Sequence, residues 1–408
     1  MRIYNSKEDK TLMKMLPTIF LLVSFAQSAD TLRVATYNIL NYNGTARNEY
    51  LQPITNEIDA DILIVQEILS QTAVNSFSTT VLNNNYSTIH FNDGPDTDNH
   101  IFYKTDKVKF ISDSYISTEL RDIAEYKLKV NSTEEFLFIY SAHLKASQGS
   151  DNEQKRLAEC TIWRDHLNQL PTATNFIILG DFNFYDSGEP GYQKLLADEA
   201  DNDGRSFDPI DSPGNWHNSE SFAGIHTQSP RVEQFGGGAS GGLDDRFDFI
   251  LISEALNDEV LPNSYTEYGN DGQHFNVSIN EGENGAVSSE IADALYYGSD
   301  HLPVYCDFVF DEVSGIESEN PKDFLLLQNY PNPFNSTTNI VFEVKERGNV
   351  KLDLYDTSGK KVLTLIDDDY SPGKYEHRFD ANSIASGEYY IVLSTDARKS
   401  SKKISLIK

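Results

Sequence analysis

Leu32-Arg-Val-Ala-Thr-Tyr-Asn-Ile-Leu40 and Ala60-Asp-Ile-Leu-Ile-Val-Gln-Glu67 are the two stretches that decide the fold. In the first, apolar and polar residues alternate before a polar loop, which predicts a β-strand. The second is a continuous apolar run, typical of a strand buried on both faces, with Glu67 at its carboxyl end. A helical stretch at residues 50–58 joins them. The sequence therefore begins a layered α/β (α+β) domain.

The same mixture of strands and helices continues to residue 310. Further strands are expected at residues 101–103, 125–130, 136–143, 175–181, 247–252 and 302–310. A helix is expected at residues 153–170, and its apolar side carries Leu157, Cys160, Trp163, Leu167 and Leu170. Polar residues repeatedly follow the strand ends, where layered α/β proteins collect their active sites.

The length and charge of the chain limit its function. Its 408 residues suggest about two domains, and the 39% of hydrophobic residues excludes a disordered chain. The net charge of −30 argues against broad electrostatic affinity for nucleic acid, which needs Lys and Arg to displace counterions. It does not exclude an enzyme that cuts nucleic acid, because a bound metal can supply positive charge locally.

The first 28 residues resemble a signal peptide. Lys10 and Lys14 precede an apolar stretch at residues 16–26, and the small residues Ser28 and Ala29 follow it. This pattern predicts export, with cleavage between residues 26 and 30. The two cysteines, Cys160 and Cys306, are expected to be buried apolar residues, although export would also permit a disulfide bridge.

Two long polar segments, residues 202–242 and 257–290, are expected to be surface loops of the catalytic domain, which we assign to residues 29–310. The first contains Gly236-Gly-Gly-Ala-Ser-Gly-Gly242, which lacks the helix and lysine of a phosphate-binding loop and is interpreted as a flexible loop. A linker is expected at residues 311–325. Short alternating strands separated by turn residues then predict a small all-β sandwich at residues 326–408.

Six short segments place polar groups at strand ends. They are Tyr37-Asn-Ile39, Gln66-Glu67, Ser141-Ala-His-Leu144, Gly180-Asp-Phe-Asn183, Asp245-Arg-Phe-Asp-Phe-Ile250 and Gly298-Ser-Asp-His-Leu-Pro303. Each segment alone is weak evidence for a functional site. Asp181 and Asn183 could form a turn, Asp248 could anchor Arg246, and His143 could be structural. Together they supply carboxylates, amides and histidines. Such a set can hold Mg²⁺, or Mn²⁺ or Ca²⁺, and hydrolyse a phosphodiester.

In this order, the segments resemble the endonuclease/exonuclease/phosphatase superfamily, whose fold is a four-layer α/β sandwich of two packed, mostly antiparallel sheets. The resemblance implies Asn38 and Glu67 at the metal, with Glu67 the principal ligand and Asp300 near a second metal position. It implies that Asp181 aligns or deprotonates the attacking water and that Asn183 contacts the phosphate. The remaining roles are Asp248 orienting His301, His301 contacting the phosphoryl group or taking a proton, and His143 acting as general acid or phosphate contact.

A histidine at position 143 is typical of the deoxyribonuclease- and sphingomyelinase-like branches, because the abasic-site repair branch has a tyrosine there. The tail resembles a different family. Leu327-Gln-Asn-Tyr-Pro-Asn-Pro-Phe-Asn335, with a strand-rich stretch and a basic end, is similar to C-terminal sorting domains of the type IX secretion machinery. This resemblance implies the outer-membrane secretion machinery as a partner and a secreted or surface-attached protein.

The sequence therefore favours a secreted metal-dependent nuclease that acts on DNA, with RNA also open, as a monomer without stable membrane insertion. The alternatives are a lipid or small-molecule phosphodiesterase or phosphatase, and a catalytically silent binding module. No amphipathic membrane-binding hairpin is evident, which disfavours a lipid substrate. Lys104, Lys145, Arg156 and Arg246 are the expected cations near the site.

Overall fold

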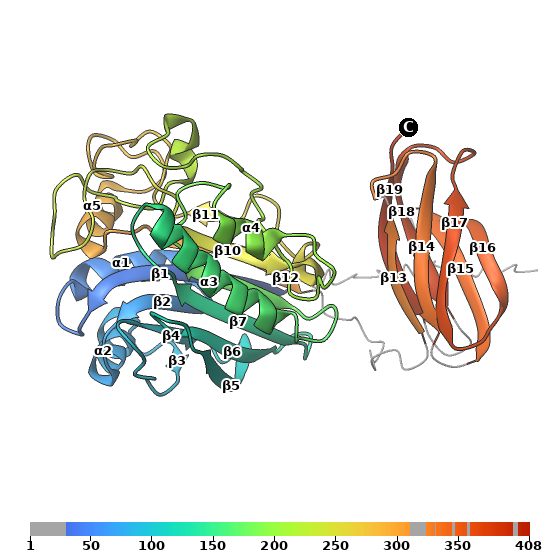
Figure 1. Cartoon of the computed structure of the whole chain (residues 1–408), viewed down its shortest axis with the longest axis horizontal. Helices are drawn as coiled ribbons and strands as arrows, with labels where there is room; N and C mark the ends of the chain where they lie inside the picture. The colour runs from blue at the N-terminus through green and yellow to red at the C-terminus, as the bar shows by residue number, and fades with distance from the viewer. Residues whose placement is uncertain (1–29, 311–323, 331, 345–346, 357–359, 395–398) are drawn as a thin grey trace, which may run out of the picture. The chain divides into compact units, whose positions relative to one another are not determined.

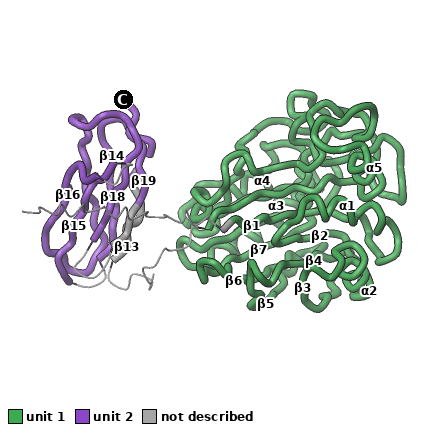
Figure 2. Tube along the Cα trace, turned by 180° about the vertical axis from the view of Figure 1, so that it is seen from behind, with its two compact units in different colours: residues 1–312 green, residues 313–408 purple. Residues whose placement is uncertain are grey.

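The structure is a computed structural model, and it describes residues 30–310, 324–330, 332–344, 347–356, 360–394 and 399–408. The chain divides into two compact units, residues 1–312 and 313–408 (Figures 1 and 2). The expected signal peptide and most of the expected linker lie outside the described residues. Residues 324 and 325, the end of that linker, begin strand β13 (Phe324–Tyr330).

The first unit contains two six-stranded sheets. One has the order β11-β12-β1-β2-β4-β3, with bounds Thr266–Glu267, Val304–Phe310, Asp30–Tyr42, Ile62–Ile68, Asp98–Tyr103 and Ser87–Thr88. The other has the order β5-β6-β7-β8-β10-β9, with bounds Val108–Ile116, Ile123–Val130, Phe136–His143, Phe176–Asp181, Asp248–Ser253 and Ser206–Phe207. Only β1 with β2, and β7 with β8, pair in parallel. The sheets are thus mixed and mostly antiparallel, as expected.

The alternation in β1 and β2 divides their side chains between two cores. Val34 and Ile62 pack into the core between the two sheets, with Ile139 and Ile177 of the other sheet. Their neighbours in sequence point to the opposite face, where Leu63 packs with residues of three helices. Burial of these apolar faces is the main favourable contribution to folding, at roughly 25 cal/mol per Å².

Helices cover the outer faces and complete the four layers. α1 (Asn48–Ile58), α2 (Gln71–Ser76) and α5 (Ser289–Gly298) pack on the outer face of the first sheet, and a π-helical turn at Phe77–Val81 continues α2. α3 (Ser150–Leu167) and α4 (Pro190–Leu196) contribute to the outer core of the second, and Figure 1 shows α3 in front of β7. Short 3₁₀ turns occupy Glu220–Ile225 and Glu254–Leu256. None of the described helices is long and apolar enough to cross a membrane.

Some elements differ from the sequence prediction. Strand β5 was not expected because most of its side chains are exposed, so it lacks an apolar pattern. Helix α5 begins in the segment expected to be a loop, with Ser288 accepting a hydrogen bond from the amide of Ile291 at 3.3 Å. The buried face of α3 includes Arg156, Glu159 and Arg164, which weakens its amphipathic pattern. Cys160 and Cys306 are both buried and free, as favoured.

The second unit is a small all-β sandwich. One sheet has the order β13-β14-β17, where β14 is Thr337–Val344 and β17 is Gly373–Asp380. The other has the order β16-β15-β18-β19, at Lys361–Tyr370, Gly348–Asp356, Gly387–Ser394 and Lys399–Leu406. Residues of both sheets, including Phe342, Phe379, Leu352 and Ile391, share one core. The expected sandwich is therefore confirmed.

Candidate functional site

The sheet registers bring the six polar segments to one end of the first unit. His143 pairs with Asp181 where the parallel strands β7 and β8 end, and Asp248 pairs with Asp181 where antiparallel β10 begins. In the other sheet, Asn38 pairs with Gln66 near the ends of β1 and β2, and β12 starts beside Thr36. Side chains remote in sequence therefore meet at a common edge.

Glu67 and Asn38 occupy a distorted part of the first sheet. The β1–β2 register shifts after Asn38, and Glu67 has a φ of +62°, in the left-handed region that ordinary residues rarely adopt. The Glu67 carboxylate accepts hydrogen bonds from the Asn38 side-chain amide at 3.1 Å and from the Asn41 backbone at 2.8 Å. Asn38 Oδ1 accepts from the Leu40 amide at 3.0 Å, so the amide nitrogen of Asn38, and not its oxygen, faces the carboxylates.

Asp181 lies between the two sheets at this end. Its carboxylate accepts from Asn38 Nδ2 at 3.0 Å and from Asn183 Nδ2 at 2.7 Å, and only 2% of the residue is exposed. Burial raises the pKa of Asp181 to about 7, and the charges of Asp248 and Glu67 act in the same direction, whereas His301 opposes them. Asp181 can therefore exchange a proton near neutral pH.

His301 is held by the fully buried Asp248. Its Nδ1 lies 2.7 Å from Asp248 Oδ2, while its Nε2 lies 2.6 Å from Gln228 Nε2 and 3.5 Å from Asp181 Oδ2. Burial by itself lowers the pKa of His301, but the carboxylates of Asp248, Asp181 and Asp300 outweigh it and raise that pKa well above its usual value. The ring is consequently protonated at neutral pH, so both of its nitrogens donate. The Gln228 side chain then faces Nε2 with its carbonyl oxygen, since two N–H donors cannot share a hydrogen bond.

His143 has the opposite pKa shift from His301. Its Nε2 lies 3.5 Å from Asp181 Oδ2 and its Nδ1 lies 3.7 Å from Glu67 Oε1, both too long for good hydrogen bonds. Burial lowers its pKa well below the usual value, and the nearby Arg121, His301 and Lys145 add to the effect. The ring is therefore neutral at neutral pH, which disfavours the expected role of general acid.

Asp300 meets the glycine-rich loop. Its Oδ2 accepts a hydrogen bond from the Ala239 amide at 2.6 Å, and its Oδ1 has no hydrogen-bond partner among the described residues. The loop approaches so closely that a Cβ at Gly238 would lie 2.5 Å from the carboxylate. This segment is thus packed against the site at Asp300, where the sequence suggested only a flexible loop.

The arrangement suits a divalent cation. The site gathers the carboxylates of Glu67, Asp181, Asp248 and Asp300, and the charges of the last three raise the pKa of His301. Buried oxygens of Asp248 and Asp300 have no hydrogen-bond partner among the described residues. Surplus buried negative charge with unsatisfied oxygens fits a hard cation with oxygen ligands.

A second group of possible ligands lies beside this site. Ligand atoms of His217, Asp244 and Asp245 lie within 4.8 Å of one another, and His217 Nδ1 is 2.7 Å from Asp245 Oδ1. Burial raises the pKa of Asp245 to about 6, assisted by the charge of Asp244. The amides of Asp244 and Asp245 both donate to the carbonyl of Gln228 at 3.0 Å, so this group also fixes the segment that contacts His301.

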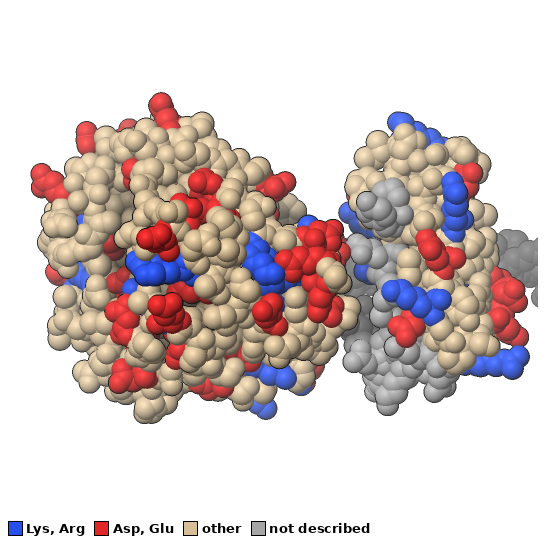
Figure 3. Space-filling view, viewed as in Figure 1, with Lys and Arg blue, Asp and Glu red and all other residues tan. Residues whose placement is uncertain are grey.

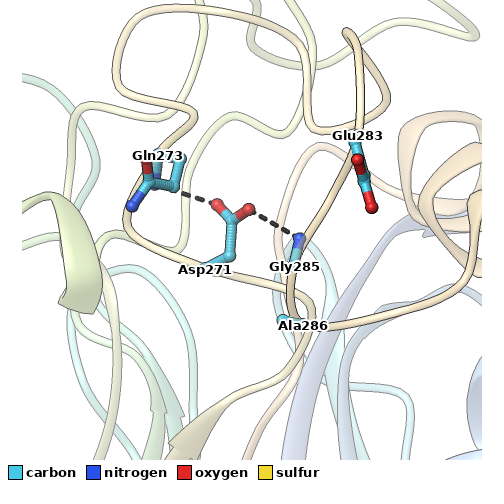
Figure 4. A pocket seen from close by; sticks show the side chains of 5 residues that line it. All are labelled: Asp271, Gln273, Glu283, Gly285 and Ala286. Carbon is cyan, nitrogen blue, oxygen red and sulfur yellow. Dashed lines mark hydrogen bonds between the residues drawn. The ribbon is translucent and has the colours of Figure 1, made fainter.

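An open surface pocket lies in the acidic loop, away from these residues (Figure 4). It is lined by Asp271, Gln273, Glu283, Gly285 and Ala286. The Asp271 carboxylate accepts hydrogen bonds from the amides of Gln273 and Gly285, at 2.9 and 2.8 Å, so it closes the loop on itself. None of these five lining residues belongs to the candidate site described above.

Three of the four basic residues expected near the site form ion pairs with carboxylates outside it. Lys104 pairs with Asp59 at 2.8 Å, beside the start of β2 and thus at the strand end opposite to Glu67. Arg156 is buried against Glu189, and Arg246 against Asp208, each with both carboxylate oxygens. Arg246 therefore does not pair with Asp248. Lys145 remains close enough for its charge to act on His143.

Three neighbours of the site were not found from the sequence. Gln228 contacts His301 from a polar segment that contains no recognisable motif. Ala239 contacts Asp300 through its backbone amide, and a backbone contact cannot be predicted from the residue type. Arg47 donates to the backbone carbonyls of Gly298 at 2.9 Å and of Leu40, and its charge acts on Tyr37, as do those of Asp300 and Arg231. Lone arginines in loops give no signal of such contacts.

Comparison with known families now adds to this geometry. The profile described as the Endonuclease/Exonuclease/phosphatase family matches residues 35–301, which span all six segments. The chain belongs to the endonuclease/exonuclease/phosphatase family. This membership supports hydrolysis of phosphoric esters as its general chemistry, and the family generally uses a divalent metal. The profile described as the Secretion system C-terminal sorting domain matches residues 328–408. It implies export by the type IX route to the cell surface or beyond.

Three solved structures are similar to this chain over 69% of its length. Truncated TDP2 of Caenorhabditis elegans is 17% identical, with a TM-score of 0.46 over 69% of this chain and 98% of that chain. TDP2 of D. rerio, complexed with single strand DNA product, is 17% identical, with a TM-score of 0.48 over 69% and 100% of the two chains. The human Nocturnin catalytic domain is 18% identical, with a TM-score of 0.46 over 69% and 97%. No curated protein matches the chain.

Proposed function

We propose that this protein is an exported, divalent-metal-dependent nuclease that acts on DNA, with RNA as a second substrate. The observation that carries the proposal is the convergence of Glu67, Asp181 and the Asp248–His301 pair at one edge of two packed sheets. This set combines a cation-binding carboxylate, a base and a protonated histidine, with His301 Nε2 3.5 Å from Asp181 Oδ2. Hydrolysis of a phosphodiester needs these groups.

Glu67 would be the principal ligand of Mg²⁺, Mn²⁺ or Ca²⁺. When bound, the cation neutralises charge on the phosphoryl oxygens and lowers the pKa of water. Asn38 fixes the carboxylates of Glu67 and Asp181 through its amide nitrogen, so we assign it a positioning role. Asp300 is the candidate for a second cation position, as the sequence suggested.

Asp181 and His301 have the roles of proton acceptor and hydrogen-bond donor. Asp181, whose pKa is raised to about 7, orients the attacking water and accepts its proton. Protonated His301, fixed by Asp248, donates a hydrogen bond from Nε2 to the phosphoryl oxygen that gains charge. His143 is neutral and contacts the phosphate beside Asp181. Asn183 Nδ2 donates to the Asp181 carboxylate at 2.7 Å and to the Leu144 carbonyl at 3.4 Å, so Asn183 positions Asp181, and its contact with the phosphate would replace the longer of these two bonds.

The charge distribution bears on the substrate. On the face shown in Figure 3, acidic side chains of the first unit surround a small group of basic ones. The engagement of Arg156 and Arg246 in buried pairs leaves few free cations at the site. Binding of a polyanion should therefore rely on the bound metal and on local contacts. A lipid or small-molecule phosphodiester is the alternative, because it needs no extended basic track.

An activity panel on the full chain tests this function. Plasmid DNA, RNA, sphingomyelin and a chromogenic phosphodiester are each incubated with Mg²⁺, with and without EDTA, across a salt series. We expect metal-dependent cleavage of DNA with a shallow salt dependence, because few phosphates are neutralised by the protein. Fast sphingomyelin hydrolysis without nucleic-acid cleavage would favour the alternative. No hydrolysis of any substrate would favour a silent binding module.

Removal of residues 328–408 is expected to block release from the cell and to leave the specific activity of the purified enzyme unchanged. The second unit has its own core, and the catalytic cluster lies entirely in the first. The measurement compares extracellular activity with the rate of the purified truncated protein. Inactivity of a folded truncated enzyme would show that the tail contributes to the site.

A further inference from the structure

Three aromatic side chains from distant parts of the chain form a cluster in the first unit. The ring of Tyr297, in α5, lies 5.0 Å from that of Tyr50, in α1, and 4.9 Å from that of Phe235, in the loop before the glycine run. Tyr50 and Phe235 also meet edge to face, with centroids 6.4 Å apart. These distances are in the range of favourable ring contacts, so the three rings form one aromatic surface.

The cluster is open to solvent. Phe235 is 36% exposed, and Tyr50 and Tyr297 are half-buried. The glycines that follow Phe235 have positive φ, and the Cβ position of Gly237 has no atom within 4 Å. An exposed phenylalanine beside a glycine run with open space does not add to the core, which leaves its ring available to a flat ligand.

The aromatic surface borders the catalytic site. Tyr297 lies three residues before Asp300, and the loop that carries Phe235 continues to Gly238 and Ala239, which contact the Asp300 carboxylate. A Cβ at Gly236 would lie 3.9 Å from Cδ of Arg47, and Arg47 holds the carbonyl of Gly298 at the end of α5. Helix α5 and the loop that carries Phe235 thus connect the three rings to the proposed cation ligand Asp300.

We propose that Tyr50, Phe235 and Tyr297 form a stacking subsite for a nucleobase of the substrate strand, next to the scissile phosphate. This inference rests on the proposed nuclease function, and it explains how an acidic protein could bind a nucleic-acid substrate by base stacking. Every nucleobase has a π-face, so stacking gives affinity without sequence preference and without basic residues. A flat base also suits a small aromatic surface better than a flexible acyl chain, which gains from a long apolar groove.

The test compares two hexanucleotides with the same number of phosphates, one of thymidines and one of abasic residues. Cleavage of each by the wild-type chain with Mg²⁺ is measured first. Affinities are then measured by fluorescence anisotropy with Mg²⁺ on an Asp181→Asn chain, which lacks the proposed base but keeps Glu67 to hold the cation. We expect the thymidine strand to bind about tenfold more tightly, since a tenfold change corresponds to about 1.4 kcal/mol, which lies within the range for stacking of one base on an aromatic side chain.

Phe235→Ala should remove most of this preference, whereas Phe235→Tyr, which keeps the ring, should preserve it. The matched control is Phe136→Ala, because Phe136 is 47% exposed but begins β7 at the strand end opposite to His143. The stacking subsite would be overturned if the chain with Phe235 intact bound the thymidine and abasic strands equally tightly. It would also be overturned if Phe235→Ala weakened the binding of both strands equally. Cleavage of both strands at equal rates would overturn this inference alone, whereas cleavage of neither would overturn the nuclease function itself.

Discussion

Glu67→Gln is expected to lower the rate of hydrolysis by about 10³-fold or more, because it removes the charge that holds the cation. A bound cation contributes several kcal/mol of transition-state stabilisation, and each 1.4 kcal/mol changes the rate about tenfold. The fold should survive. Glutamine has one accepting oxygen where Glu67 accepts from both Asn38 and Asn41, so one hydrogen bond is lost, which costs about 1 kcal/mol.

The measurement is kcat with saturating Mg²⁺, together with a thermal unfolding curve and the metal stoichiometry of each variant. Glu125→Gln is the matched control. Glu125 is also half-buried and also accepts a polar partner, His166 at 2.7 Å, but it lies in β6, away from the site. Retention of the wild-type rate by Glu67→Gln, or a wild-type enzyme that EDTA does not inhibit, would contradict the proposed metal role.

The core of this fold could be predicted from the sequence because burial leaves a clear periodic pattern. Alternation around Val34 and the continuous apolar run before Glu67 both correspond to strands that pack on helices on one side and on a second sheet on the other. Positions just past these strands then had to meet at one edge. For this reason the sequence predicts that the acidic and amide residues of the candidate site lie together, and the family resemblance adds the role expected of each.

Other features leave no periodic pattern. Arg156 and Arg164 are buried on the face of α3 because Glu189 and backbone carbonyls satisfy them, and such partners cannot be identified from spacing. The registers that place Gln228 against His301 depend on loops with no apolar pattern. Protonation states were also beyond the sequence. His143 and His301 are both buried, but the carboxylates around His301 give it the opposite pKa shift.

His301→Ala is expected to lower kcat by roughly 10²–10⁴-fold, the range for a positioned acid–base group. It also removes a hydrogen bond from Asp248, whose carboxylate is fully buried. Breaking a buried pair in this way costs about 3–5 kcal/mol of stability. The rate must therefore be measured on the folded fraction, with the unfolding free energy of each variant determined in parallel.

Two comparisons separate chemistry from folding. The double variant Asp248→Asn with His301→Ala replaces the stranded carboxylate by a neutral amide, so it should recover part of the lost stability but none of the lost rate. His166→Ala removes a ring that contacts Glu125 at 2.7 Å, the same distance as in the His301–Asp248 pair, and should leave kcat unchanged. His217 is unsuitable for this purpose, because its partner Asp245 fixes the backbone of Gln228 beside His301. Recovery of the rate together with stability in the double variant would show that His301 supports the fold and takes no part in the reaction.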